Sequence, residues 1–233
     1  MKRKNFLFSI ISLISLLLLI IIVFSVVITC KQINPIADLS HLQGDTDILE
    51  TGAVLIEGVG IYFQPGDSTC GIAALSTTVS YLKGKEIPPE ELIIKYNIPK
   101  NGAMNYNQFL KYLSMELQGY EIEYSNELSD YELISAIHNQ LLDSIPVPIF
   151  FGSPNPYNEP FYDFHASVVT GIDLEKKKVY IANVYGCKEE ISIVEFLNRM
   201  SYREIDRYPF IQRIIIKLEL IDTNSIFLIK EKL

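Results

Sequence analysis

Residues 64–75 read QPGDSTCGIAAL, and this short segment decides the fold. It opens with a turn-forming run of Pro, Gly, Asp and Ser, and Cys70 follows at the point where the sequence becomes apolar. Apolar residues then recur at helical spacing up to Leu82, and Gly84 comes soon after them. Because glycine commonly ends a helix, the pattern predicts a helix over residues 70–83 that begins at the cysteine.

A cysteine at the first turn of a helix is well suited to act as a nucleophile. The attacking species is the thiolate, and the positive end of a helix dipole, together with a nearby imidazolium, lowers the pKa of a thiol. The side-chain amide of Gln64 could join the backbone N–H of Cys70 in binding an oxygen that gains charge during acyl transfer. We therefore expect Cys70 to be the nucleophile and Gln64 the oxyanion donor; the alternative is a small cysteine in the core.

The chain has three histidines, of which one is placed to serve as a general base. His165 begins an apolar, β-branched run that ends at Asp173 and predicts a strand. A base at the end of a strand can project into a cleft. His41 lies in a segment that we interpret as a linker, and His138 stands among apolar residues of a predicted helix. We therefore predict that His165 is the general base.

Asn183 ends the next predicted strand, on the same face as Val179 and Ile181. An amide oxygen near the second ring nitrogen of a histidine fixes the tautomer of that ring. We therefore predict that Asn183 orients His165. The alternative is an ordinary strand-end asparagine that starts a turn.

The three cysteines, Cys30, Cys70 and Cys187, do not form a disulfide framework. A bridge between Cys70 and Cys187 is conceivable outside the cell and would block the site. Structural zinc usually shows a close-spaced pair of ligands, and the chain has no such pair. We therefore predict no metal and no cofactor.

Residues 6–29 are apolar and uncharged, and are long enough to cross a hydrocarbon core of about 30 Å as a helix. Lys2, Arg3 and Lys4 precede them, which favours a cytoplasmic N-terminus and an extracytoplasmic remainder. We expect a single-pass anchor in the cell membrane, and a cleaved signal or a lipoprotein signal ending at Cys30 is the alternative.

We divide the whole chain into three parts. The anchor with its basic tip spans residues 1–30, a linker spans residues 31–52, and one domain spans residues 53–233.

The net charge is −8, and all 28 acidic residues follow position 30. This acidic balance argues against a nucleic-acid partner.

Periodicity predicts helices first and strands later, which is an α+β pattern. The expected helices are residues 70–83, a helix opened by Pro88-Pro89, residues 105–117, a helix opened by the capping box at Ser129, and a short helix from Ser192 to Met200. The expected strands are residues 53–63, 147–151, 165–172, 178–184, 211–221 and 226–229. We expect the nucleophile and the base to meet at a cleft between the two halves.

At this point the motifs resemble a known family. The cysteine segment at 64–75, the histidine strand at 165–173 and the Val179–Asn183 strand are similar to those of the papain superfamily. The greatest similarity is to the bacteriocin-processing (double-glycine leader) peptidases and their stand-alone C39-like relatives, over roughly residues 61–199. The resemblance implies a papain-like fold with a helical lobe followed by an antiparallel sheet lobe, and it implies the roles given above for Gln64, Cys70, His165 and Asn183.

Two features depart from that family. It usually has aspartate followed by proline where this chain has Asn183-Val184. Its members are usually fused to an export ATPase, and this chain has no phosphate-loop motif.

The resulting expectation is a membrane-anchored cysteine peptidase that acts on peptides or proteins through a thioester acyl-enzyme. Two alternatives remain open: acyl transfer, as in phytochelatin synthase, which the motif spacing also resembles, and a catalytically silent peptide-binding domain in bacteriocin export or immunity, with an export machinery as partner. The Pro- and Tyr-rich segment 155–162 either forms part of the cleft wall or is a plain surface loop.

Overall fold

The computed structural model describes residues 17–18, 52–99, 102–156 and 160–232. The predicted anchor at 6–29 and linker at 31–52 therefore lie almost wholly outside the described residues. Within the described part of the chain, no helix combines the length and the apolar character needed to cross a membrane.

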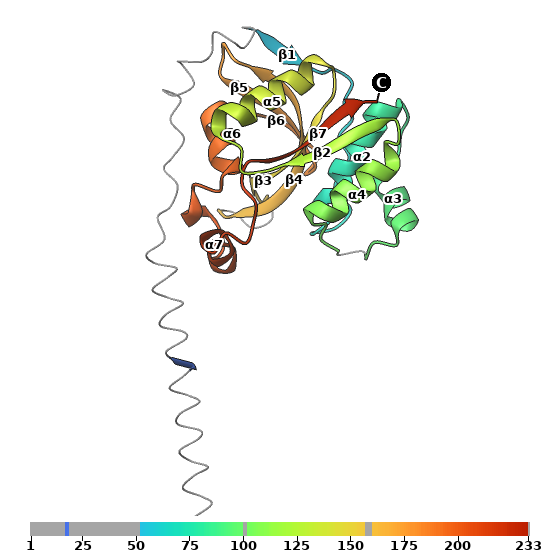
Figure 1. Cartoon of the computed structure of the whole chain (residues 1–233). Coiled ribbons are helices and arrows are strands. Elements are labelled where there is room, and N and C mark those ends of the chain that lie inside the picture. Colours follow the sequence, from blue (N-terminus) through green and yellow to red (C-terminus); the bar gives the residue numbers. More distant parts are fainter. Residues whose placement is uncertain (1–16, 19–51, 100–101, 157–159, 233) are drawn as a thin grey trace, which may run out of the picture.

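The described domain combines six α-helices with seven strands (Figure 1). The helices are α2 (Cys70–Lys83), α3 (Pro89–Tyr96), α4 (Tyr106–Glu116), α5 (Asp130–Leu142), α6 (Ile193–Met200) and α7 (Phe210–Lys217), with a short 3-10 turn, η2 (Ile205–Arg207). The strands are β1 (Ala53–Leu55), β2 (Tyr120–Ser125), β3 (Val147–Pro154), β4 (Tyr162–Asp173), β5 (Lys178–Asn183), β6 (Cys187–Ser192) and β7 (Ser225–Glu231).

The strands form one antiparallel sheet in the order β2-β7-β3-β4-β5-β6, and β1 pairs with the end of β4. Helices α2, α3 and α4 lie together on one side of the molecule, as Figure 1 shows. Of the predicted α+β class, the mixture of helices with an antiparallel sheet is confirmed. The register of β4 against β5 brings two predicted site residues together, because it places His165 and Asn183 close to each other at the same end of the sheet.

Helix α2 spans the predicted residues, from Cys70 to Lys83. Residues 71–79 of the helix are all buried, so its stability comes mainly from packing rather than from an amphipathic surface. Gly84 ends it in the left-handed conformation, as expected for glycine. Thr69 is the N-cap residue and makes no side-chain cap, because its hydroxyl bonds to the backbone of Gly66 instead and closes the preceding turn.

Capping residues begin the later helices. Ser129 makes the predicted full capping box at α5, and Asn105 makes one at α4 that was not predicted. At α6, the Ser192 hydroxyl accepts from the backbone N–H of Glu195. The glutamate does not complete the box, because its carboxylate binds Arg199 instead.

A buried carboxylate joins the three helices of the helical side. Glu116 at the end of α4 accepts from Lys83 of α2 at 2.6 Å and from Lys95 of α3 at 2.6 Å. The hydroxyl of Tyr96 donates to it at 2.7 Å. These contacts hold the pKa of Glu116 low, at about 2, even though burial works in the opposite direction.

Several predictions about the elements are wrong. The strand expected over 53–63 ends at Leu55, and the strand expected over 211–221 is mostly helix α7. Pro209 stands at the N-cap of α7, and no residue of α7 is buried. Its run of β-branched residues suggests a strand, but Pro209 starts a helix there and the segment pairs with no strand of the sheet.

Two strands were not predicted. Strand β2 lies in the first half of the chain and pairs with β7 near the C-terminus, so the helical and sheet parts do not follow one another strictly. Strand β6 follows β5 after a tight turn in which Gly186 has a positive φ.

Candidate active site

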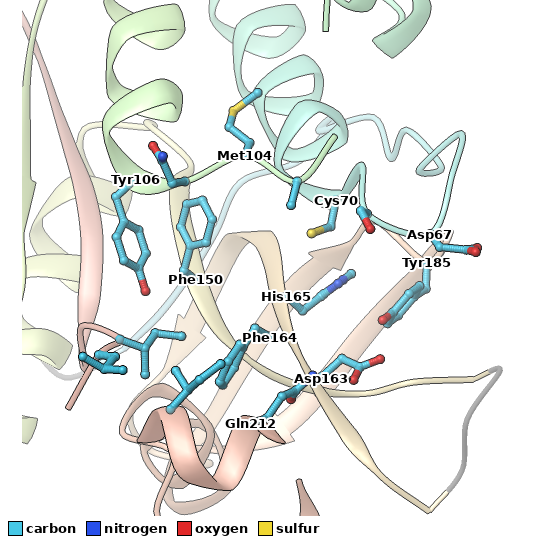
Figure 2. A pocket seen from close by; sticks show the side chains of 16 residues that line it. Asp67, Cys70, Met104, Tyr106, Phe150, Asp163, Phe164, His165, Tyr185 and Gln212 are labelled. Atoms are coloured by element: carbon cyan, nitrogen blue, oxygen red, sulfur yellow. Dashed lines mark hydrogen bonds between the residues drawn. The ribbon is translucent and has the colours of Figure 1, made fainter. Parts of the chain in front are cut away.

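Cys70 and His165 line the same open cavity, which has a volume of about 500 Å³ (Figure 2). The cysteine comes from the first residue of α2, and the histidine comes from β4. A helix and a strand that lie almost a hundred residues apart in the sequence therefore bring the predicted nucleophile and base to the same cavity. The other lining residues are Asp67, Ser68, Ala103, Met104, Asn105, Tyr106, Phe150, Asp163, Phe164, Tyr185, Gln212, Ile215, Leu220 and Ile221.

Asn183 lies beside His165, as predicted. The ring nitrogen Nε2 of His165 is 3.0 Å from Oδ1 of Asn183, and both residues are buried. Since an amide oxygen can only accept, Nε2 must carry the proton of this hydrogen bond. Nδ1 is then the ring nitrogen with a lone pair when the imidazole is neutral.

The amide of Asn183 makes three further contacts. Its oxygen accepts from the backbone N–H of Tyr185 at 3.0 Å. Its nitrogen donates to the carboxylate of Glu189 at 2.9 Å and to the hydroxyl of Ser153 at 3.3 Å. The amide is therefore held at both ends.

The ring of Tyr185 stacks on the imidazole of His165, with centroids 4.1 Å apart and planes 15° apart. Figure 2 shows both rings at the cavity, below Cys70. The stack covers one face of the imidazole, which limits the orientations open to that ring.

Burial dominates the electrostatics of the pair. It lowers the pKa of His165 to about 4, although the hydrogen bond to Asn183 acts the other way. It raises the pKa of the Cys70 thiol, against hydrogen bonds from the backbone of Ala166 and Gly71 that lower it. The expectation of a lowered thiol pKa is therefore wrong, and taken one at a time both groups favour the neutral form.

Gln64 lies near Asn183 but not in the cavity wall. It is buried, and its backbone N–H donates to the carbonyl of Val184 at 2.9 Å. Its side-chain oxygen is buried without a hydrogen-bond partner. The structure thus brings Cys70, His165 and Asn183 together, whereas the oxyanion role expected for Gln64 stays a prediction.

The glycine after the cysteine has a steric reason. A Cβ at Gly71 would stand 2.9 Å from Cβ of Met104, closer than real contacts allow. Met104 itself lines the cavity. The small residue therefore lets the loop before α4 approach the start of α2 and form one wall of the site.

Helix α7 closes the far side of the cavity. Gln212 donates to Asp163 at 2.9 Å, which ties the helix to β4 two residues before His165. Ile215, Leu220 and Ile221 give this wall an apolar surface. Because the sequence pattern suggested a strand here, this wall was not foreseen.

Two other predictions can be placed. Cys187 is exposed, and both it and Cys70 are free thiols, so the conceivable bridge between them is absent. Segment 155–162 joins β3 to β4, and its described residues are not among those lining the cavity. The prediction that this segment forms part of the cleft wall is therefore not supported by its described part.

Sequence reasoning missed Tyr185, Glu189, Ser153 and Arg199. The available signal was the alternation of β6: Glu189 pairs opposite Ile181 and so belongs on the face that carries Asn183. A charged residue on an inward face of a strand calls for a partner, and Arg199 supplies it at 2.5 Å.

One known protein family matches this chain. Residues 56–209 match the family model described as the Peptidase_C39 like family. No curated protein matches the chain.

Several solved structures are similar at low identity. One is a double glycine motif protease from an AMS/PCAT transporter in complex with the leader peptide, at 17% identity, 78% of this chain, 100% of that chain and a TM-score of 0.48. Another is a C39-like peptidase from Bacillus anthracis, which is 13% identical over 78% of this chain and 98% of that chain, with a TM-score of 0.49. A third is xylellain, a cysteine protease from Xylella fastidiosa, which is 15% identical over 78% of this chain and 87% of that chain, with a TM-score of 0.45.

The family model covers well over half of the chain. The chain therefore belongs to the peptidase C39-like family and has a C39-like cysteine peptidase fold.

Proposed function

We propose that this member of the peptidase C39-like family is a cysteine peptidase that hydrolyses peptide bonds through Cys70, His165 and Asn183. The observation that carries the proposal is the 3.0 Å contact between His165 Nε2 and Asn183 Oδ1 beside a cavity that also exposes Cys70. That contact leaves Nδ1 to take the thiol proton.

Acylation begins when Nδ1 of His165 accepts the Cys70 proton and the sulfur attacks the peptide carbonyl carbon. The C=O electrons move to the oxygen, and backbone N–H groups at the start of α2 are suited to bind that oxyanion. The intermediate collapses as the C–N bond breaks, and the imidazolium gives its proton to the leaving amine. A thioester remains on Cys70.

Deacylation repeats the steps with water. His165 takes a proton from water while the hydroxyl oxygen attacks the thioester carbon. The C–S bond then breaks, the sulfur recovers its proton from the imidazolium, and a carboxylic acid leaves. Proton transfer within the pair does not require a low thiol pKa at rest, which agrees with the raised pKa of Cys70.

The cavity favours a peptide with an apolar side chain near the reacting carbonyl. Tyr106, Phe150 and Phe164 contribute aromatic surface, whereas Asp67 and Asp163 give it a negative rim. Carboxylates on a rim attract basic groups. The proposed substrates are therefore peptides that combine an apolar residue with a basic neighbour.

The remaining parts of the proposal rest on the sequence. The apolar run at 6–29, preceded by basic residues, supports a single-pass anchor with the peptidase domain outside the cytoplasm. An export machinery is the proposed partner of a peptidase in that position.

The experiment is cleavage of a peptide library by the full-length chain, compared with Cys70→Ala. Mass spectrometry of the products should show new termini that are absent with Cys70→Ala. Added hydroxylamine or free amino compounds would divert the acyl group if transfer competes with hydrolysis. Peptides that bind without being cleaved would instead support the silent binding domain.

A further inference from the structure

The orientation of the Asn183 amide decides which nitrogen of His165 carries a proton. An asparagine side chain has an acceptor end and a donor end, and rotation by half a turn exchanges them. With Oδ1 toward His165, the ring must donate from Nε2, and Nδ1 is a base. With the amide reversed, Nε2 would have to accept, so the proton would move to Nδ1 and the ring could not take a thiol proton.

Two contacts act on this choice from outside the pair. The backbone N–H of Tyr185 can only donate, and it meets Oδ1 of Asn183. The carboxylate of Glu189 can only accept, and it meets Nδ2. The third contact, with the Ser153 hydroxyl, imposes no direction, because a hydroxyl can both donate and accept.

Glu189 is itself fixed by a buried cation. Its second oxygen, Oε1, accepts from Arg199 at 2.5 Å, and the side chain of Arg199 is only 4% exposed. Arg199 also binds Glu195 and lies against the ring of Tyr162. Because a guanidinium only donates, Glu189 must present an acceptor to Arg199 as well as to Asn183.

We propose that Glu189, held by Arg199, is a positioning residue that fixes the Asn183 amide and thereby keeps His165 in the tautomer with a proton on Nε2. This inference rests on the proposed function for its catalytic consequence, but the tautomer can be measured without any substrate. It also accounts for an asparagine at position 183, since a carboxylate there would face the Glu189 carboxylate at hydrogen-bond distance.

Glu189→Gln is the decisive variant. Glutamine has nearly the same shape as glutamate, but it replaces one of the two acceptor oxygens with an NH₂ group that donates. Arg199 will draw the amide oxygen of the new side chain, which leaves an NH₂ group facing Nδ2 of Asn183. Two donors cannot share that position, so Glu189→Gln removes one of the two contacts that fix the Asn183 amide and favours its reversal, against the remaining backbone N–H of Tyr185. The control is Glu190→Gln: Glu190 is the next residue of the same strand, is more than half exposed and pairs with Lys178 at 3.3 Å.

The test is ¹⁵N NMR of the His165 ring near pH 7, together with peptide cleavage kinetics. The neutral ring should carry its proton on Nε2 in the wild type and in Glu190→Gln, and a substantial share should move to Nδ1 in Glu189→Gln. We expect kcat to fall by roughly 10²-fold or more with little change in KM, since a triad histidine held in the wrong tautomer loses up to about 10⁴-fold.

The outcomes separate this inference from the proposed function. A wild-type ring protonated on Nδ1, or an unchanged tautomer in Glu189→Gln, would overturn the inference even if peptide cleavage is found. A shifted tautomer in a protein that cleaves no peptide would support the inference and contradict the peptidase.

Discussion

Two glutamates, Glu116 and Glu189, each accept hydrogen bonds from basic side chains, but in different parts of the molecule: two lysines bind Glu116 and one arginine binds Glu189. Glu116 joins α2, α3 and α4 through Lys83 and Lys95, and none of these three residues lines the cavity. Glu189 joins β6 to α6 through Arg199, and its other oxygen meets Asn183 of the candidate site. The contacts of Glu116 hold helices together. The contacts of Glu189 instead fix which end of the Asn183 amide faces His165, and so which ring nitrogen of His165 carries the proton.

The difference lies in what each carboxylate faces on its second side. Lys83 and Lys95 are partly exposed and keep water as an alternative partner, so the Glu116 cluster contributes mainly to stability. Asn183 is buried and has two unlike ends, so the acceptor that it meets decides its orientation. Variants of the two regions should therefore separate stability from activity.

The largest effect should come from a second carboxylate beside Glu189. Asn183→Asp places like charges at hydrogen-bond distance, and we expect kcat to fall by about 10² to 10³-fold. Adding Glu189→Gln should recover most of that loss, because the new amide can accept from Arg199 and donate to the carboxylate at 183. A double-mutant cycle on kcat measures this coupling, and simple additivity of the two changes would contradict the account.

The pH dependence of stability should distinguish the two regions next. The folded state holds the pKa of His165 at about 4, below the ordinary 6.5, so the unfolded chain binds a proton that the folded chain does not. Unfolding free energy should therefore fall by up to about 3 kcal/mol as the pH drops from 6.5 to 4. Urea titrations should show this loss in the wild type but not in His165→Gln.

The same titrations cover the helical region at lower pH. The pKa of Glu116 is held at about 2, below the ordinary 4.5, so its stabilisation is complete above 4.5 and disappears as the pH falls toward 2. Glu116→Gln should cost about 2 kcal/mol at neutral pH and leave kcat within about twofold. A loss of activity without a loss of stability would reverse the assignment of the two glutamates.

The smallest effect should come from the ring that covers His165. Tyr185→Phe keeps the stack and should leave kcat nearly unchanged, whereas Tyr185→Leu should lower it by up to about tenfold, which corresponds to about 1.4 kcal/mol, near the upper value for an aromatic pair. Steady-state kinetics of the two variants measures the difference. Equal activities would mean that the stack does not orient the imidazole.

Local signals carried the parts of the fold that could be predicted. The spacing of apolar residues and Gly84 predict α2, and the capping residues Ser129 and Ser192 mark two helix starts. Cys70, His165 and Asn183 were chosen from their positions at element ends, and the structure brings these three together.

The parts that failed depend on distant partners. Segment 211–221 has a strand-like composition, but Pro209 starts helix α7 there and the segment does not pair with the sheet. Glu189 acts through Asn183 and Arg199, which are brought together by the turn at Gly186 and by α6. The raised pKa of Cys70 comes from burial by elements that no local pattern reveals.

The most direct test of the nucleophile–base pair is alkylation of the full-length chain by iodoacetamide at neutral pH, with the modified cysteines located by mass spectrometry. Cys187 is exposed and serves as an internal standard in the same molecule. Because burial raises the pKa of Cys70, any excess reactivity must come from His165. We predict that Cys70 reacts faster than Cys187, and that His165→Ala removes this excess while leaving Cys187 unchanged. A Cys70 that reacts no faster than Cys187, or that ignores the loss of His165, would contradict the account.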